Sequence, residues 1–366
     1  MANTNLTAAM RAKNDEFYTQ YGDIEKEINA YLEYDPDVFR GKTILLPCDD
    51  PEWSNFTKFF AQNFQSLGLK KLISTSYAAD SKTYKGVYQP SLLETRNPQY
   101  DEKKTKIKGK IFTLTHDKSG DGRIDVDDLE WQYLSGEGDF RSGEIKKLRD
   151  EADIIITNPP FSMFREFLAW IVESDKKFVI IGSVSAITYK EIFPLIKNNE
   201  MWMGNGFQAG NAHFSTPFAK EYGEGVYNPE TGLVKFRNVC WFTNLDHGKR
   251  HQPLDLMPMQ DHLRFSKHKE IKGKESYEKY DNYDAIEVPF TDAIPSDYGG
   301  VMGVPISFLA KHSPEQFEIV GLLAGNIQGL AGIPSATGKD GPYINGKLKY
   351  GRVLIRSLLQ RKKESA

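Results

Sequence analysis

The feature that most constrains the fold is an alternation of short apolar, β-branched runs with segments whose hydrophobic residues recur at helical spacing. A continuous apolar run of about four to eight residues is typical of a strand buried on both faces, as in a parallel sheet. Strands that alternate with helices predict βαβ crossovers and a doubly wound sheet, in which ligands bind beyond the carboxyl ends of the strands. The predicted strands are 42–47, 70–77, 152–158, 177–184 and 239–246, and the predicted helices are 55–64, 164–173 and 189–198.

Two interruptions divide this pattern. Residues 79–135 are polar and rich in Lys and Asp, and we interpret them as an insertion that decorates the sheet. Beyond residue 245, repeated prolines punctuate short segments, which favours a smaller, irregular second domain. At roughly 150 residues per domain, a chain of 366 residues fits two domains. The sequence therefore predicts one domain at 1–245, with the insertion at about 79–135, and another at 246–366.

The charge of the chain excludes some classes of function. Its 47 Lys and Arg stand against 50 Asp and Glu, a net charge of −3, which excludes a histone-like polycation. The charge is uneven, however: residues 343–366 contain seven Lys or Arg and one Glu, and residues 247–274 contain seven against three acids. Either cluster alone has the plain interpretation of a solvated surface. Two clusters beyond residue 245 favour a local basic face.

Neither a membrane span nor a secretory signal is expected. The longest nearly unbroken apolar stretch, 178–187, is about half of the roughly 20 residues that cross a bilayer. The N-terminal residues lack the apolar core of a signal peptide. We therefore expect a cytoplasmic protein with no membrane partner.

The tetrapeptide Asn158-Pro159-Pro160-Phe161 directly follows a predicted strand and precedes a helix. The Asn158 side-chain carbonyl and a backbone carbonyl, held outward because proline fixes φ and lacks a donor, would aim two acceptors at one point. Such a pair can bind an exocyclic amino group and direct its nitrogen lone pair at an electrophile, as methylation of a base nitrogen requires. Phe161 would offer a face for base stacking, worth roughly 1–3 kcal/mol. A strand-terminating turn is the alternative, but the position after a buried strand favours catalysis.

This tetrapeptide resembles the catalytic motif of the N6-adenine methyltransferases of DNA, and the resemblance to the EcoRI-type modification methylases extends over almost the whole chain. We therefore expect a Rossmann-like α/β methyltransferase sheet followed by a smaller C-terminal target-recognition region. The matching blocks, in family order, are DEFYTQYGDIE (15–25), CDDPEWSNFTKFF (48–60), LGLKKLI (67–73), GDFRS (138–142), ITNPPFSMFRE (156–166), ITYKEIF (187–193), WFTNLD (241–246), YDNYDAI (280–286) and GVMGVPISFL (300–309).

The resemblance implies S-adenosylmethionine as the methyl donor. In the family, the loop after the first strand holds the methionine part, an N-terminal segment closes over the methionine tail, and an acidic and aromatic pair binds the adenine. The matching residues are Cys48, Asp49 and Asp50 in the loop, Phe17, Tyr18 and Thr19 in the N-terminal segment, Asp139 and Phe140 in the pair, and Asn158, which is shared with the catalytic motif. The second strand ends without the usual acid that holds ribose, so no residue is assigned to that contact.

The resemblance also implies an activity: transfer of a methyl group to the N6 atom of an adenine flipped out of duplex DNA. We expect a monomer that serves as the modification half of a restriction-modification system, with a cognate endonuclease that forms no stable complex with it. The basic residues expected to contact DNA are Lys249, Arg250, Arg264, Lys267 and Lys269.

Other interpretations stay open at this point. The fold could serve a catalytically silent DNA-binding or assembly subunit, or the motif could methylate RNA adenine or a protein glutamine amide; the basic C-terminal region argues against the protein substrate. Residues 117–128 nearly reproduce a twelve-residue calcium loop. The strand-like sequence before it and an Asp at its last position weaken that interpretation, and we expect no metal.

Overall fold

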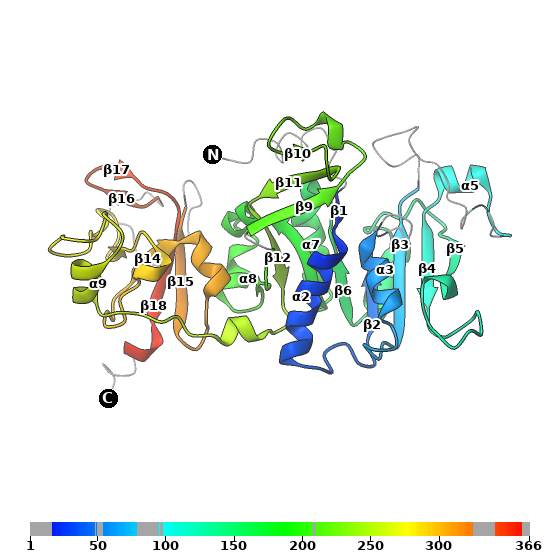
Figure 1. Ribbon diagram of the computed structural model, residues 1–366, viewed down its shortest axis with the longest axis horizontal. Coiled ribbons are helices and arrows are strands. Elements are labelled where there is room, and N and C mark those ends of the chain that lie inside the picture. Colours follow the sequence, from blue (N-terminus) through cyan, green and yellow to red (C-terminus); the bar gives the residue numbers. More distant parts are fainter. Residues whose placement is uncertain are drawn as a thin grey trace. The chain divides into compact units, whose positions relative to one another are not determined.

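The computed structural model describes residues 17–47, 49, 54–78, 95, 98–207, 210–324 and 341–360. The chain forms two compact units, and each is described by itself (Figure 1). The first comprises residues 1–184 and 204–245, and the second comprises residues 185–203 and 246–366. The second unit therefore includes 185–203, a segment that the sequence pattern assigned to the first domain.

Contacts within the second unit explain why 185–203 belongs to it. The Arg250 guanidinium lies 3.9 Å from the centre of the Trp202 ring and donates to Asn199 Oδ1 at 3.2 Å. A hydrogen bond of 3.0 Å joins His247 Nε2 to the Met203 carbonyl. These are tertiary contacts between distant residues, so periodicity along the chain could not have indicated them.

The first unit is built on a large mixed sheet with the strand order β5-β4-β3-β2-β6-β7-β12. Its central strand, β2, pairs in parallel with both β3 and β6, and β6 pairs in parallel with β7. Strand β12, the last strand of this order that belongs to the first unit, is antiparallel to β7. The strands are β2 (Thr43–Leu46), β3 (Lys71–Ser76), β4 (Lys110–Leu114), β5 (Glu130–Tyr133), β6 (Ile154–Thr157), β7 (Lys177–Ser183) and β12 (Val239–Thr243). The predicted α/β sheet is confirmed.

The helices of this unit are amphipathic and have local start signals. Ser54 caps the first turn of α3 by accepting a hydrogen bond from Phe56 N at 3.1 Å, and Phe56, Phe59 and Phe60 of that helix are buried. Each such aromatic ring stabilises the fold by about 1.5–3 kcal/mol through burial. The helices are α2 (Tyr21–Tyr34), α3 (Asn55–Gln62), α5 (Glu102–Ile107), α6 (Gly143–Glu151) and α7 (Phe164–Val172).

The segment interpreted as a decorating insertion contributes to the sheet itself. Strand β4 pairs antiparallel with β3, and β5 pairs antiparallel with β4. The alternating burial of β4 is that of a strand with one face in the core. The described part of 79–135 therefore extends the sheet by two strands.

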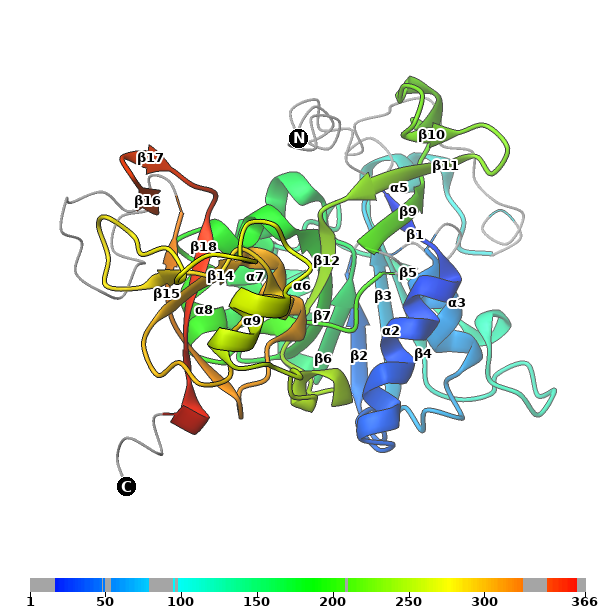
Figure 2. The ribbon, with the colours of Figure 1, turned by 60° about the vertical axis from the view of Figure 1, so that its left-hand side comes forward.

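A small antiparallel sheet lies beyond one end of the large sheet, next to α2 (Figure 2). Its order is β1-β9-β11-β10, and its inner face brings together the rings of Phe17, Phe214 and Phe236. The strands are β1 (Tyr18–Thr19), β9 (Asn211–Ser215), β10 (Tyr227–Asn228) and β11 (Leu233–Arg237). The N-terminal segment is thus held by strands nearly 200 residues later in the chain.

The second unit has a sheet of its own, which the proline-rich sequence did not indicate. Strand β18 pairs antiparallel with β14 and β15, and a separate hairpin, β16–β17, precedes it. Its strands and helices are α8 (Phe193–Lys197), β8 (Trp202–Met203), α9 (Met259–Phe265), β13 (Ile286–Glu287), β14 (Met302–Pro305), β15 (Phe317–Leu323), β16 (Tyr343–Ile344), β17 (Lys347–Leu348) and β18 (Arg352–Ser357). The prediction of an irregular domain was wrong, because the prolines lie at the ends of strands and in loops.

Short 3₁₀ helices connect the elements of both units. They are η2 (Val126–Asp128), η3 (Phe161–Met163), η4 (Val184–Thr188), η6 (Ala219–Glu221), η7 (Gly248–His251), η8 (Thr291–Ala293) and η9 (Ile306–Lys311). Within the described part of the chain, every helix falls short of the length and apolarity that crossing a bilayer requires.

A buried carboxylate ties α2 to the segment that leads into β9. Glu27 has no exposed surface, and it accepts hydrogen bonds from Tyr31 Oη at 2.6 Å and from the backbone N–H groups of Asn205 and Gly206 at 2.9 and 3.0 Å. A Cβ atom at Gly204 would lie 2.0 Å from Glu27 Oε1, so the chain passes too close to this carboxylate for any other residue.

We expect Glu27→Ala to lower the free energy of unfolding by about 2–5 kcal/mol, because it leaves two backbone donors without their acceptor. Glu25→Ala, on the exposed face of the same helix, is the matched control and should change stability by no more than about 0.5 kcal/mol. Urea denaturation of both variants measures the difference. Equal stability of the two variants would contradict the role given to Glu27.

Candidate functional site

Four loops of the first unit open at the same edge of the large sheet. Strands β2, β3 and β6 are mutually parallel, and β5 runs in the direction of β3 because each is antiparallel to β4. The loops that follow these strands contain Asp49, Asp139 and Asn158. The sheet therefore gathers, at its carboxyl edge, three polar residues that are far apart in the sequence.

Asn158 is held in one orientation by the N-terminal segment. Its Nδ2 atom donates to the Phe17 carbonyl at 2.7 Å, which points the other half of the amide away from that carbonyl. Its Oδ1 atom is shielded from solvent and accepts no hydrogen bond from any described residue. A buried acceptor without a partner costs about 1–3 kcal/mol, so it marks a position where a donor from a ligand would be favourable.

Pro159 and Pro160 restrict the backbone conformation directly after Asn158. Pro160 is the N-cap of η3, and its carbonyl accepts from Met163 N at 2.9 Å. The Pro159 carbonyl accepts no bond from the described residues, so it is the candidate for the second acceptor. Proline at both positions removes two backbone donors from the neighbourhood of these acceptors.

Phe161 is buried rather than open for stacking. It is 3% exposed, and its ring centre lies 5.8 Å from that of Phe17 and 6.4 Å from that of Phe214. A base can stack on this ring only if one of its neighbours moves. The assignment of Phe161 to base stacking stays a prediction.

Asp49 is fixed by three hydroxyl groups, two from the start of α3 and one from β3. Its Oδ1 atom accepts from Ser54 Oγ at 2.7 Å, and its main-chain carbonyl accepts from Thr57 Oγ1 at 2.9 Å and from Ser74 Oγ. Ser74 of β3 thus has a structural partner. Cys48 and Asp50 lie outside the described residues.

Asp139 forms an ion pair that the sequence analysis missed. Its carboxylate accepts from Arg141 Nε at 2.9 Å and from Arg141 Nη2 at 2.6 Å. This hydrogen-bonded guanidinium lowers the pKa of Asp139 below its ordinary value, so the carboxylate is charged at neutral pH. Gly138, with φ of +93°, allows the turn, because a Cβ atom there would lie 2.4 Å from the Ser76 carbonyl. In the sequence, the presence of Arg141 two residues after Asp139 could have indicated this ion pair.

Phe140 faces the core. It is 1% exposed and packs edge to face against Phe167 and Trp170 of α7, with ring centres 5.1 and 5.7 Å away. This packing anchors the loop that carries Asp139, while the proposed contact of Phe140 with adenine stays a prediction.

The remaining cofactor candidates lie on β1. Thr19 is 2% exposed, and its Oγ1 atom is buried and accepts or donates no hydrogen bond among the described residues. Its carbonyl accepts from Asn55 Nδ2 at 2.7 Å, which joins β1 to α3. Tyr18 pairs with Ser215 in the small sheet. Thr19 thus supplies a second buried polar atom with capacity for a ligand.

The predicted DNA-binding residues differ in their surroundings. Arg250 is 10% exposed at its side chain and is held by Trp202, as described above, and by Asp246 at 3.4 Å. Lys249 is half-buried, whereas Arg264, Lys267 and Lys269 are exposed, and Lys267 also pairs with Asp292 at 2.7 Å. The exposed three are therefore better placed to meet a polyanion than Arg250.

The calcium-like loop satisfies its carboxylates internally. Asp128 accepts from the backbone of Lys118, Ser119 and Asp125, and Asp117 accepts from that of Gly120 and Gly122. Among the described residues, no group of three or more His, Cys, Asp or Glu side chains is arranged to hold a metal ion. The loop is a hydrogen-bonded turn that follows strand β4.

Comparison with known proteins adds to this geometry. Residues 5–358 match the family described as adenine-specific methyltransferase EcoRI. The chain belongs to this family. It is 40% identical to Type II methyltransferase M.EcoRI of Escherichia coli over 97% of both chains. It is also 33% identical to Type II methyltransferase M.MgeORF184P of Mycoplasma genitalium, over 96% of this chain and 98% of that one.

A third relative is Type II methyltransferase M.MpnI of Mycoplasma pneumoniae, which is 31% identical over 95% of this chain and 96% of that one. No solved structure matches the chain. Membership of the family makes the protein an adenine-specific DNA methyltransferase, and the large α/β sheet agrees with the fold expected for one.

For this methyltransferase we expect Asp139→Ala to weaken binding of S-adenosylmethionine by about 10- to 100-fold. The expected cause is the loss of a hydrogen bond between the cofactor and the charged carboxylate. Glu166→Ala is the matched control, since Glu166 is exposed and also contacts Arg141, at 3.3 Å, but lies outside the loop. Calorimetric titration with the cofactor measures both. Unchanged affinity in Asp139→Ala would contradict the assignment.

Proposed function

We propose that this methyltransferase transfers a methyl group from S-adenosylmethionine to the N6 atom of an adenine flipped out of duplex DNA, with Asn158 accepting a hydrogen bond from the adenine amino group. The observation that carries the proposal is the solvent-shielded Oδ1 atom of Asn158, which has no described partner, while Nδ2 is fixed by the Phe17 carbonyl. An amide in any other rotation would present donors to an amino group that is itself a donor.

The residues at the carboxyl edge fit the proposed cofactor. The buried Asp49 carboxylate suits an ammonium group, and the Thr19 hydroxyl and the Asp139 carboxylate add further polar contacts. When bound, the sulfonium of S-adenosylmethionine supplies an electrophilic methyl group. Asp139 Oδ2 accepts one hydrogen bond from Arg141, from Nη2 at 2.6 Å, so this carboxylate oxygen keeps acceptor capacity for an adenine amino group.

Burial of the acceptor requires the base to leave the helix. Asn158 and Phe161 are shielded by the small sheet, and a base stacked inside a duplex cannot reach them. Extrusion of a nucleotide costs a few kcal/mol, which contacts in the pocket would offset. Phe161 would take part once Phe17 or Phe214 moves away from its ring.

The wider role follows from the same proposal. We infer that the protein acts as a monomer in the cytoplasm, where its DNA substrate is found, and that it protects sites from a cognate endonuclease without a stable complex. Exposed basic residues of the second unit, Arg264, Lys267 and Lys269, would contact phosphates.

Asn158→Ala is expected to lower methyl transfer by at least about 100-fold with little change in cofactor affinity, because the lost acceptor serves the target amine. Tritiated S-adenosylmethionine with duplex DNA, RNA or protein as acceptor measures the transfer. Asn29→Ala, on the exposed face of α2, is the matched control and should keep the parent rate. Parent-like activity in Asn158→Ala would overturn the assigned role, and transfer only to RNA or protein would overturn the substrate.

Asn158→Asp tests separately the acceptor atom of this side chain and the hydrogen bond that orients it. The carboxylate keeps an acceptor but loses the donor to the Phe17 carbonyl, so we expect partial activity between the parent and Asn158→Ala. Activity equal to the parent would show that the bond to Phe17 does not position this side chain.

Combined neutralisation of Arg264, Lys267 and Lys269 to Gln should weaken DNA binding. If each contacts one phosphate, the log–log dependence of affinity on salt should become shallower by about 0.9 per residue. Cofactor affinity should be unchanged. Fluorescence anisotropy at several salt concentrations measures the slope, and an unaltered slope would exclude these residues from the DNA contact.

A further inference from the structure

The β16–β17 hairpin and the two residues after it are highly exposed. Six consecutive residues, 345–350, are exposed, and their sequence is Asn-Gly-Lys-Leu-Lys-Tyr. Leu348 of β17 is 56% exposed, and Tyr350, just after this strand, is 87% exposed, which is high for large side chains with apolar surface. The six residues include two lysines and no acid, so the exposed stretch is both basic and apolar.

The hairpin is nevertheless held rigidly. The Asp281 carboxylate accepts from the backbone N–H groups of Asn345 and Gly346 at 3.0 and 2.7 Å, which fixes the turn. The Asn282 side chain bonds to the Gly341 carbonyl at 2.7 Å and to Tyr343 N at 3.1 Å. Asn345 has φ of +51°, a left-handed conformation that Asn tolerates well.

The exit from the hairpin is anchored in the core of the same unit. Arg352, which begins β18, donates from Nε to Glu287 Oε1 at 3.0 Å, and Tyr280 donates to the same carboxylate. Both members of the ion pair are buried. Residues 345–350 therefore project between two fixed ends, and little conformational entropy would be lost when they bind a partner.

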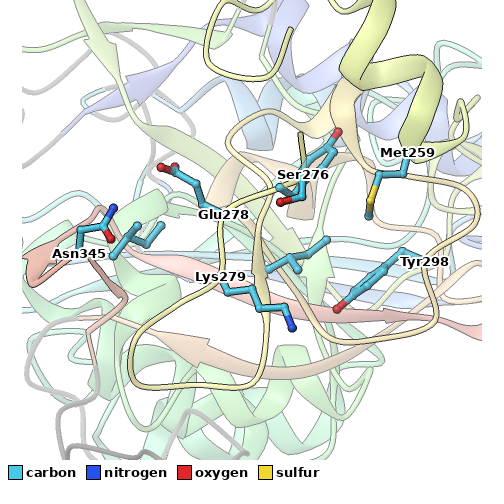
Figure 3. Close-up of a pocket in the computed structure, with 9 residues that line it drawn as sticks. Met259, Ser276, Glu278, Lys279, Tyr298 and Asn345 are labelled. Atoms are coloured by element: carbon cyan, nitrogen blue, oxygen red, sulfur yellow. The ribbon is translucent and has the colours of Figure 1, made fainter. Parts of the chain in front are cut away.

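The surroundings of the hairpin add polar groups on one side. A cavity of about 440 Å³ is lined by Asn345 and Ile344 of the hairpin together with Glu278, Lys279 and Tyr298 (Figure 3). Glu278 and Asn345 lie toward one end of it, and Tyr298 lies toward the other. None of the predicted catalytic or cofactor residues lines this cavity.

We propose that the β16–β17 hairpin inserts into the major groove of the DNA substrate, with Lys347 and Lys349 contacting phosphates and the Asn345 amide reading a base edge. A two-stranded ribbon fits a groove about 12 Å wide, and an Asn amide can pair with adenine through two hydrogen bonds. Leu348 and Tyr350 would pack against sugars and thymine methyl groups. The proposal rests on the proposed function only in taking duplex DNA as the substrate.

The double variant Lys347→Ala/Lys349→Ala tests the proposed phosphate contacts of the two lysines. Its salt dependence of DNA affinity should be shallower by about 1.8 in log–log slope, the sum of two phosphate contacts. Lys197→Ala/Lys311→Ala removes the same charge from exposed positions of the second unit outside the hairpin and should keep the parent slope. A parent-like slope in the hairpin variant, or an equal loss in the control variant, would overturn the proposal.

The reading part is tested by Asn345→Gly, which removes the amide without straining the left-handed backbone. Sequencing of methylated duplex libraries should show a relaxed preference of about tenfold at one base pair, with the salt slope unchanged. Asp281→Ala, which releases the turn, should relax the same base pair. Parent-like preference in both variants would overturn the reading role.

Measurements on the parent protein distinguish a failure of the hairpin proposal from a failure of the proposed catalytic site. Cofactor affinity of each hairpin variant should match the parent, because the substitutions change the second unit, whereas Asn158 and Asp49 belong to the first. If the parent protein is active and the hairpin variants bind DNA as the parent does, only the proposal about the hairpin is contradicted. An inactive parent that still binds DNA through the hairpin contradicts the catalytic proposal alone.

Discussion

Parallel pairing of β2 with β3 on one side and with β6 on the other is the constraint on which the candidate site depends. It brings the loops after these strands to one edge, so that Asp49 and Asn158, more than 100 residues apart, belong to one site. Hydroxyl groups then fix that edge: Thr157 Oγ1 donates to the Pro47 carbonyl at 2.9 Å, and Ser74 and Thr57 hold Asp49. Small hydroxyl side chains at strand ends can do this because they reach neighbouring carbonyls without filling the space a ligand needs.

The hydrogen bond between Asn158 and the Phe17 carbonyl links the candidate catalytic side chain to the N-terminal segment. Phe17 precedes β1, and β1 is held in place by β9, so the orientation of the amide depends on both ends of the first unit. The Phe17 ring itself covers Phe161, at 5.8 Å between ring centres, and Phe214 packs against both rings. A movement that opened Phe161 to a base would therefore act on the segment that orients Asn158. The two events are expected to be coupled through shared packing.

In the second unit, buried anchoring groups and exposed side chains of the β16–β17 hairpin are separated along the chain. Buried groups such as Glu287 and Arg352 supply rigidity, while the turn residues between them carry the exposed side chains. Arg250 is also basic, but it is not exposed in the same way, because its guanidinium packs on Trp202 and pairs with Asp246. Counting charges in a segment does not distinguish these cases, since a guanidinium that packs internally looks the same in sequence as one that meets a phosphate.

The sequence by itself determined the strands β2, β3, β6, β7 and β12, the helix α3, and the position of Asn158 after a buried strand, because apolar periodicity and capping residues are local signals. It did not indicate that 79–135 would extend the sheet, that 185–203 would join the second unit, or that Asp139 would pair with Arg141. Likewise, only the folded chain showed that Phe161 is covered and that Asn158 Oδ1 is left without a partner. These features arise from contacts between residues distant in the chain, whose partners tertiary packing alone selects, and so they were decided by the tertiary structure.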